Sequence, residues 1–285
     1  MFFTKKYKNL IKENNKILKN IENKFPITNP PQKKEEEYRF IELNKLYFKV
    51  RNHWFFNEFE TQGWEPQTYF TYKNYLTKET TYVDIGTWVG LTVMFASEIG
   101  VNKIYGIEAN KLSYELTCEN CKMNKLTEKA TIDNLCILDK DNTLVHFGST
   151  NSSETSSASS IKGNSWLIPS IKLMTYLKEK NIQDDKLFIK IDIEGAEELI
   201  VEDLKNLAEK KDIIIYLSIH PTFWDNKEVA GRNILDACYK FQEVKDSANN
   251  NLAKEKLEEM IFTEDSHPAW GTIHGNFFEV ILINT

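Results

Sequence analysis

The sequence has few cysteines, the residues that form disulfide cross-links and many structural metal sites. Four cysteines occur in 285 residues, and only Cys118 and Cys121 have the C-x-x-C spacing. A zinc site of the common type needs a second such pair, and the chain has none. These two thiols lie in a stretch with helical spacing, where we interpret them as filler. Cys136 and Cys238 lie in apolar patterns and are predicted to pack in the core.

Long apolar runs and an excess of positive charge are also missing. The longest apolar run, around Ile213 to Leu217, is far too short to cross a bilayer. The first residues hold no apolar stretch of signal-peptide length. A formal net charge of −6 makes a general grip on nucleic acid unexpected. We therefore expect a cytoplasmic protein with no membrane span and no nucleic-acid partner.

The chain is long enough for one large domain plus an extension, and 41% of its residues are hydrophobic. Apolar residues recur every three or four positions between residues 5 and 25, which indicates an amphipathic helix. This helix would either pack on the domain or form a contact between copies in a homo-oligomer. Residues 26–37 have the composition of a linker, and residues 38–59 partly alternate like a hairpin. We assign residues 1–76 to an N-terminal extension and 77–285 to the main domain.

Strand-like and helix-like segments alternate through the main domain. This alternation predicts a mostly parallel sheet with right-handed crossovers. The order of the segments is compatible with a seven-stranded sheet whose last strand is antiparallel. The expected strands are 82–85, 103–107, 131–138, 186–192, 212–220 and 277–283, and the expected helices are 69–76, a helix that begins at 91–96, 111–125, 173–180, 197–207 and 233–241.

A glycine-containing loop follows the first of these strands. It has the form Asp84-x-Gly86-x-x-x-Gly90, and glycines let a backbone approach a ligand closely. Glu108 ends the next strand 24 positions after Asp84, a distance suited to a hydrogen bond with ribose hydroxyls. A carboxylate at the strand end would repel pyrophosphate but suits a cationic ligand such as S-adenosylmethionine. The alternative is an ordinary strand–turn–helix with no ligand.

Three acids and one histidine follow strand ends: Asp84, Glu108, Asp192 and His220. Ligands of open α/β sheets bind at this edge. Asp192 and His220 could be a base and its orienting acid. With Glu194, which shares a face with Asp192 in an extended backbone, they could instead hold Mg²⁺ or Mn²⁺. Glu197 is interpreted as an acid that favours a helix N-terminus.

Two further segments have functional interpretations. The serine-rich stretch 149–160 is either a disordered surface loop or a lid that orders on substrate. The aromatic, turn-rich stretch from His267 to His274 is a candidate wall of a substrate pocket. Residues 38–76 precede the cofactor strand, and in this architecture such a segment usually lies over the cofactor edge of the sheet.

Together these motifs resemble the FkbM family of S-adenosylmethionine-dependent O-methyltransferases, from about Trp64 onward. Tyr82 to Gly90 matches the family's loop Val-Asp-(Val/Ile)-Gly-Ala-Asn-x-Gly, and Ile107 to Asn110 matches Phe-Glu-Pro-Asn. Ile189-Lys-Ile-Asp-Ile-Glu-Gly-Ala-Glu197 matches the family hallmark Ile-Lys-Ile-Asp-Val-Glu-Gly-Ala-Glu. The chain departs from the family pattern at Trp88 for Asn, Ala109 for Pro, and Met174 and Thr175 for two acids.

The resemblance implies a Rossmann-like class I methyltransferase that moves a methyl group from S-adenosylmethionine to a hydroxyl of a small molecule. Asp192, His220 and Glu194 are then the catalytic residues, or the ligands of a divalent metal ion. The family also suggests a sugar or nucleotide-activated sugar, used in surface polysaccharide synthesis, as the acceptor. The implied cofactor-binding residues are Asp84, Gly86, Thr87, Trp88, Gly90, Glu108 and Asn134.

Two other classes of function remain open at this point. One is a pseudo-methyltransferase that binds the cofactor and serves as an assembly partner, although the intact Asp192 and Glu194 count against it. The other is a nicotinamide-dependent dehydrogenase, against which the missing third glycine counts.

Overall fold

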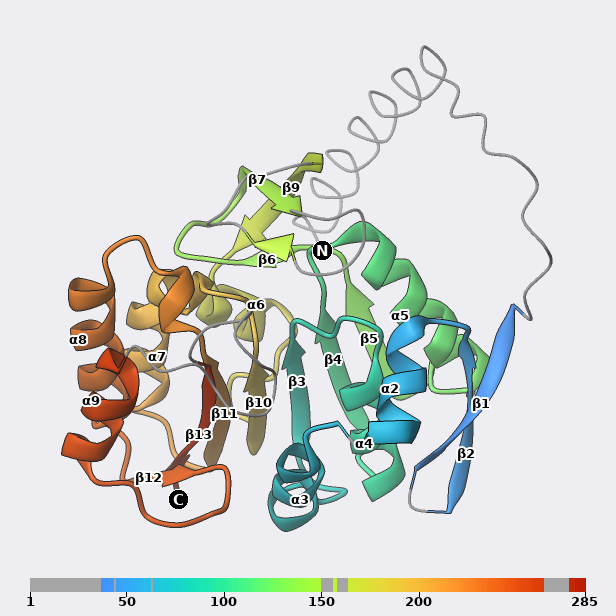
Figure 1. Ribbon diagram of the computed structural model, residues 1–285, viewed down its shortest axis with the longest axis horizontal. Helices are drawn as coiled ribbons and strands as arrows, with labels where there is room; N and C mark the ends of the chain where they lie inside the picture. Colours follow the sequence, from blue (N-terminus) through green and yellow to red (C-terminus); the bar gives the residue numbers. More distant parts are fainter. Residues whose placement is uncertain (1–36, 44, 63, 150–155, 158–163, 264–276) are drawn as a thin grey trace. The chain divides into compact units, whose positions relative to one another are not determined.

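The computed structural model of the chain describes residues 37–285, except for 44, 63, 150–155, 158–163 and 264–276 (Figure 1). Residues 38–285 form one compact unit. The predicted amphipathic helix and linker, most of the serine-rich stretch and the segment from His267 to His274 lie outside the described residues. None of the helices in the described part of the chain has the length and apolarity that a bilayer crossing requires.

A seven-stranded sheet forms the centre of the unit (Figure 1). Its last strand in sequence, β13 (Phe278–Asn284), is antiparallel to both neighbours, and the other adjacent pairs are parallel. The sheet confirms the predicted α/β class I methyltransferase fold. In spatial order the strands are β12 (Glu243–Asp246), β13, β11 (Ile213–Ile219), β10 (Leu187–Ile191), β3 (Thr81–Ile85), β4 (Lys103–Ile107) and β5 (Ala130–Asp133).

The central strands are apolar because helices cover the sheet. Every residue of β3 and β10 is buried, so strand sequences such as Leu-Phe-Ile-Lys-Ile lack a solvent-facing half. Helix α3 packs on α4, and α8 packs on both α7 and α9. The α-helices are α2 (Trp54–Gln62), α3 (Pro66–Tyr75), α4 (Leu91–Ile99), α5 (Lys111–Met123), α6 (Leu173–Glu179), α7 (Val201–Leu207), α8 (Lys227–Cys238) and α9 (Lys254–Phe262).

Residues 38–76 share one apolar core with the central sheet. The predicted hairpin consists of β1 (Tyr38–Leu43) and β2 (Leu46–Arg51), and β2 lies against α5 (Figure 1). The backbone N–H of Arg51 donates to Asn120 Oδ1 at 2.9 Å, which satisfies part of the open strand edge. Phe55, Phe56 and Tyr72 belong to the same buried cluster as residues of β3 and α4. A domain boundary after residue 76 stays a prediction.

The third predicted strand, residues 131–138, is wrong as one element. The chain leaves the central sheet after β5, and β6 (Cys136–Ile137) joins a second sheet with β7 (Thr143–Ser149), β8 (Ser156–Ser157) and β9 (Asn164–Ile171). Asn134 lies at the break, and its side-chain amide donates to the carbonyl oxygens of Glu108 (2.7 Å) and Ala109 (3.3 Å). This side chain therefore ties the end of β4 to the start of the second sheet.

Three predicted helices begin at other residues than expected. The helix predicted over 69–76 is α3, which begins at Pro66. The segment predicted as a helix over 197–207 starts as a 3₁₀ turn, η1 (Ala196–Ile200), before α7. Helix α8 begins at Lys227 rather than 233, because the Asn226 side chain accepts a hydrogen bond from the backbone of Val229 and caps the helix. Strand β12 and helices α2 and α9 were not predicted, and α2 occupies the last residues of the stretch 38–59 that partly alternates like a hairpin.

Candidate active site

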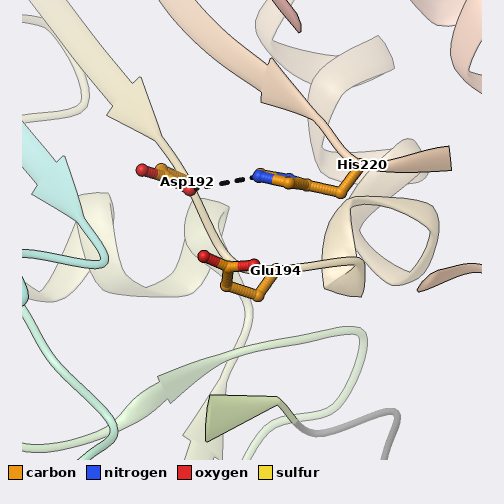
Figure 2. A group of neighbouring side chains, drawn as sticks. All are labelled: Asp192, Glu194 and His220. Atoms are coloured by element: carbon orange, nitrogen blue, oxygen red, sulfur yellow. Dashed lines mark ion pairs between the residues drawn. The ribbon is translucent and has the colours of Figure 1, made fainter. Parts of the chain in front are cut away.

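The carboxyl ends of β10 and β11 bring three predicted site residues together. Asp192 and Glu194 follow β10, and His220 follows β11. One ligand atom from each of the three lies within 4.8 Å of the others (Figure 2). Glu194 and Gly195 both have left-handed backbone conformations, with φ of 54° and 96°. This sharp exit from the strand lets Asp192 and Glu194 present their carboxylates beside the same imidazole.

Strand register explains how Lys190 reaches Asp192. Lys190 is the Cα partner of Asp84 on the neighbouring parallel strand, and Asp192 lies two residues further along the same face. The Lys190 ammonium donates to the carbonyl oxygen of Gly86 at 2.7 Å. It also lies 3.2 Å from Asp192 Oδ2 and 3.6 Å from Asp84 Oδ1. Burial opposes the charge of Lys190, but these carboxylates outweigh it and raise the lysine pKa.

Asp192 is held as a carboxylate by two cations. Burial opposes its ionisation, but the charges of Lys190 and His220 outweigh burial and lower the pKa of Asp192. The side chain keeps 28% of its surface exposed, so this carboxylate faces the space above the sheet. A fixed, ionised and accessible oxygen suits a proton acceptor or a metal ligand.

His220 is bound on both ring nitrogens. Its Nδ1 lies 2.9 Å from Glu197 Oε1. Its Nε2 lies 3.6 Å from Asp192 Oδ1, and Figure 2 shows this ion pair. Burial favours the neutral ring, but Glu197, Glu194 and Asp192 outweigh it and raise the pKa of His220 to about 10. At neutral pH the ring is therefore an imidazolium, which is hydrogen-bonded to Glu197 through Nδ1 and ion-paired with Asp192 through Nε2. Of the two candidate bases, Asp192 is the one able to accept a proton.

Glu197 is the acid that orients His220, a role that sequence reasoning missed. The carboxylate is fully buried. Its second oxygen accepts a hydrogen bond from Trp224 Nε1 at 3.3 Å. The helix N-terminus explanation does not account for these side-chain contacts. The signal was present in the spacing, since Glu197 shares helical positions i, i+3 and i+7 with the buried Ile200 and Leu204.

A first cavity lies between the loop after β3 and the ends of β4 and β10. Glu108 faces it, and the two carboxylate oxygens accept backbone hydrogen bonds from Trp88 (2.8 Å) and Asn110 (2.7 Å). Burial raises the pKa of Glu108 to about 7. Each oxygen keeps a second lone pair for a ligand hydroxyl. The cavity wall includes Gly86, Trp88, Glu108, Ser113, Phe147, Asp192 and Glu194.

The other predicted cofactor residues of the glycine loop are buried and support its conformation. Asp84 is fully buried and accepts a hydrogen bond from Thr92 Oγ1 at 2.5 Å. Thr87 is buried, and a Cβ at Gly90 would lie 3.0 Å from the side chain of Thr117. Asp84, Thr87, Gly90 and Asn134 do not line either of the two described cavities.

Gly86 is required by the protein itself. Its φ of 84° is left-handed, and an added Cβ would lie 1.9 Å from the carbonyl oxygen of Asp192. The glycine loop therefore touches the backbone of Asp192, and only glycine permits this approach.

A second cavity opens on the other side of Asp192. It is lined by aromatic rings, carboxylates, Ser218 and His220, and it shares Trp88, Asp192 and Glu194 with the first cavity. Part of its wall comes from α2 and the turn before α3, so residues 38–76 supply one side of the site. Its aromatic residues are Trp54, Phe55, Trp64, Trp88, Phe223 and Phe277, and its carboxylates are Glu58, Glu65, Asp192, Glu194 and Glu279.

Comparisons with known proteins give two structural similarities. Among solved structures, the chain is similar to methyltransferase FkbM from Methylobacillus flagellatus KT, at 16% identity and a TM-score of 0.35, over 50% of this chain and 33% of that one. It thus spans about a third of that protein's length. It is also similar to a candidate O-methyltransferase from Klebsiella pneumoniae, at 11% identity and a TM-score of 0.45, over 78% and 81% of the two chains. No curated protein matches the sequence.

A family match decides the assignment. The model of the methyltransferase FkbM domain matches residues 84–250, which is more than half of the chain. The matched range begins at the acid of the glycine loop and includes Glu108, Asp192, Glu197 and His220. This chain therefore belongs to the FkbM methyltransferase family.

Proposed function

We propose that this protein transfers a methyl group from S-adenosylmethionine to a hydroxyl oxygen of a small molecule, with a sugar as the favoured acceptor class. The observation that carries the proposal is the pair of cavities that meet at Asp192. The first has the glycine loop and Glu108 expected of a nucleoside site. The second is lined by aromatic rings and carboxylates and would hold the acceptor. A methyl donor and an acceptor would then meet beside an ionised carboxylate.

The residues of the first cavity fit the cofactor. Glu108 offers acceptor lone pairs for two ribose hydroxyls, and Gly86 leaves backbone space beside it. Asp192 and Glu194 supply negative charge where a sulfonium and an ammonium need it. When bound, the cofactor supplies an activated methyl group whose carbon–sulfur bond breaks as the acceptor oxygen attacks, leaving the electron pair on sulfur.

Asp192 takes the proton of the acceptor hydroxyl in this proposal. A hydroxyl is a poor nucleophile at neutral pH, and a positioned base typically contributes about 10²–10⁴-fold. Lys190 and His220 hold the carboxylate in place from two directions. Glu197 in turn fixes the His220 ring through Nδ1, so its Nε2 stays directed at Asp192. The rest of the protein's contribution is to place the acceptor oxygen against the methyl group.

A metal-assisted variant is favoured by one specific observation. The donor atoms of Asp192, Glu194 and His220 lie close enough to surround one cation. The two carboxylates suit Mn²⁺ or Mg²⁺, and the imidazole would join them as a neutral ring after binding of the ion released its Nε2 proton. Glu197 on Nδ1 has the place of the carboxylate that usually supports a metal-bound histidine. These three residues would hold the ion, and the ion would lower the pKa of the acceptor hydroxyl.

We expect Glu108→Ala to weaken the binding of S-adenosylmethionine. Hydrogen bonds to a charged acceptor are worth roughly 1.5–3 kcal/mol each, which sets an upper bound on the loss from two of them. Isothermal titration calorimetry measures the change, and Glu115→Ala, an exposed glutamate on α5, is the matched control. Thermal denaturation of both variants separates affinity from fold stability. Unchanged affinity in a folded Glu108→Ala variant would remove this carboxylate from the cofactor site.

Metal removal distinguishes the two versions of the chemistry. In the base version EDTA leaves turnover unchanged, because Lys190 and His220 already balance the charge of Asp192. This is the result we expect. Turnover is followed as release of S-adenosylhomocysteine from a panel of sugars and sugar nucleotides, before and after dialysis against EDTA. Loss of turnover that Mn²⁺ or Mg²⁺ restores would replace the base version with the metal version.

A further inference from the structure

The second cavity has an unusual electrostatic composition. Five carboxylates line it, from Glu58, Glu65, Asp192, Glu194 and Glu279, and the only basic side chain among the described lining residues is His220. Asp192 and Glu194 already share the charge of His220. The other three acids, Glu58, Glu65 and Glu279, have no lysine or arginine near them among the described residues that line the cavity.

Strand register and two side-chain hydrogen bonds place two of these acids beside β11. Glu279 on β13 is the Cα partner of Ser218 on β11, and Ser218 points to the same face as His220 two residues later. Glu65 precedes α3, and its carboxylate accepts a hydrogen bond from Thr68 Oγ1 at 2.9 Å. Thr68 in turn contacts the hydroxyl of Tyr216 at 3.0 Å, two residues before Ser218 on β11.

Glu65 and Glu279 both line this cavity, and the charged form of each is disfavoured there. Burial, the charge of Glu279 and the charge of Asp192 together raise the pKa of Glu65 to about 8. Burial and the charge of Asp192 raise the pKa of Glu279 to about 7. Burial and neighbouring carboxylates thus disfavour the charged form of both groups, and a cation bound between them would favour the charged form again.

The remaining wall is aromatic. Trp88 packs against Phe55 with ring centroids 4.4 Å apart, and Phe55 packs against Trp64 at 5.4 Å. Trp54 lies 6.0 Å from Trp88. Aromatic faces combined with carboxylates recognise alkylammonium groups through cation–π and ionic attraction together. The same surface repels a phosphate or pyrophosphate.

We infer that the methyl acceptor is a cationic alcohol, a polyol that carries an ammonium group near the hydroxyl that is methylated, and that Glu65, Glu279 and the aromatic wall bind this ammonium group. The inference rests on the proposed O-methyl transfer and narrows its acceptor class. It favours amino sugars over the nucleotide-activated sugars that the family resemblance suggests, because the diphosphate of a sugar nucleotide would meet carboxylates here.

A matched pair of probes tests the charge requirement without knowledge of the acceptor. Choline and 3,3-dimethylbutan-1-ol have the same shape and the same hydroxyl, and only choline is charged. We expect choline to bind at least tenfold more tightly in calorimetry with S-adenosylhomocysteine present. Glu65→Gln and Glu279→Gln should each reduce this preference, whereas the exposed control Glu202→Gln should not. Equal binding of the two probes, or detectable binding of neither, would overturn the inference.

Turnover separates this inference from the proposed function. Glucosamine, glucose and UDP-glucose are compared as acceptors by S-adenosylhomocysteine release, and the product is located by NMR. We expect O-methylation with a preference for the amino sugar of tenfold or more. Faster O-methylation of glucose or UDP-glucose would overturn the cationic acceptor and leave the O-methyltransferase proposal intact. A product methylated on nitrogen would instead overturn the proposed function while the ammonium site stands.

Discussion

Asp192→Asn is expected to lower turnover by about 10² or more while the affinity for S-adenosylmethionine stays within a few-fold of wild type. The asparagine side chain keeps the size of the carboxylate but cannot accept the acceptor proton. In the proposed site Glu108 and the glycine loop would hold the nucleoside end of the cofactor, and Asp192→Asn leaves them unchanged. Single-turnover measurement of S-adenosylhomocysteine release, paired with calorimetry, separates the two effects. Asp236→Asn, on the exposed face of α8, is the control.

The same experiment on the neighbouring residues defines the base. His220→Ala should also lower turnover by about 10², because the imidazolium is one of the two cations that fix Asp192. Glu197→Gln should produce a smaller loss, since it keeps one acceptor oxygen for His220 but removes the charge. If Asp192→Asn and His220→Ala both retain near-normal turnover, the acceptor must be activated by other groups. If Glu197→Gln behaves as wild type, the orienting role of Glu197 is wrong.

Gly86→Ala is expected to destabilise the protein and to inactivate it together. A methyl group at this position would overlap the carbonyl oxygen of Asp192, and the left-handed φ adds backbone strain. We expect a loss in the free energy of unfolding on the order of 3 kcal/mol. For a unit of this size that is a fall in Tm of roughly 6–12 °C by differential scanning calorimetry.

Gly100→Ala is a matched control for this prediction. Gly100 also has a left-handed φ, of 104°, but an added Cβ meets nothing within 4 Å. This variant therefore carries the backbone strain without the overlap. Equal destabilisation of the two variants would show that strain alone accounts for the effect, and that the close approach to Asp192 is unimportant.

The strand ends were predictable from the sequence because parallel strands share one polarity. An acid after an apolar run marks the carboxyl edge, so Glu108, Asp192 and His220 could be placed together without a structure. The hallmark from Ile189 to Glu197 added the family. The charge states of the site residues could not be predicted in this way. The imidazolium of His220 depends on three carboxylates at once, one of which is the buried Glu197.

Long-range packing accounts for most of what was missed. The reason for Gly86 is a backbone contact with a residue more than 100 positions away, which no local pattern records. The break between β5 and β6 depends on Asn134 reaching the carbonyl groups after β4. The wall of the second cavity combines Glu65 with Glu279, and they meet through the β11–β13 register and the hydrogen bonds that join Glu65, Thr68 and Tyr216.

The concentration of tryptophan around the second cavity gives the protein a built-in optical reporter. Of the six tryptophans in the chain, Trp54, Trp64 and Trp88 line the cavity, and Trp224 donates to Glu197 behind it. Intrinsic emission therefore originates largely from the neighbourhood of the active site. Acceptor screening can use unlabelled protein and a fluorimeter, with no coupled assay, because an occupant of this cavity would change the surroundings of three indole rings at once.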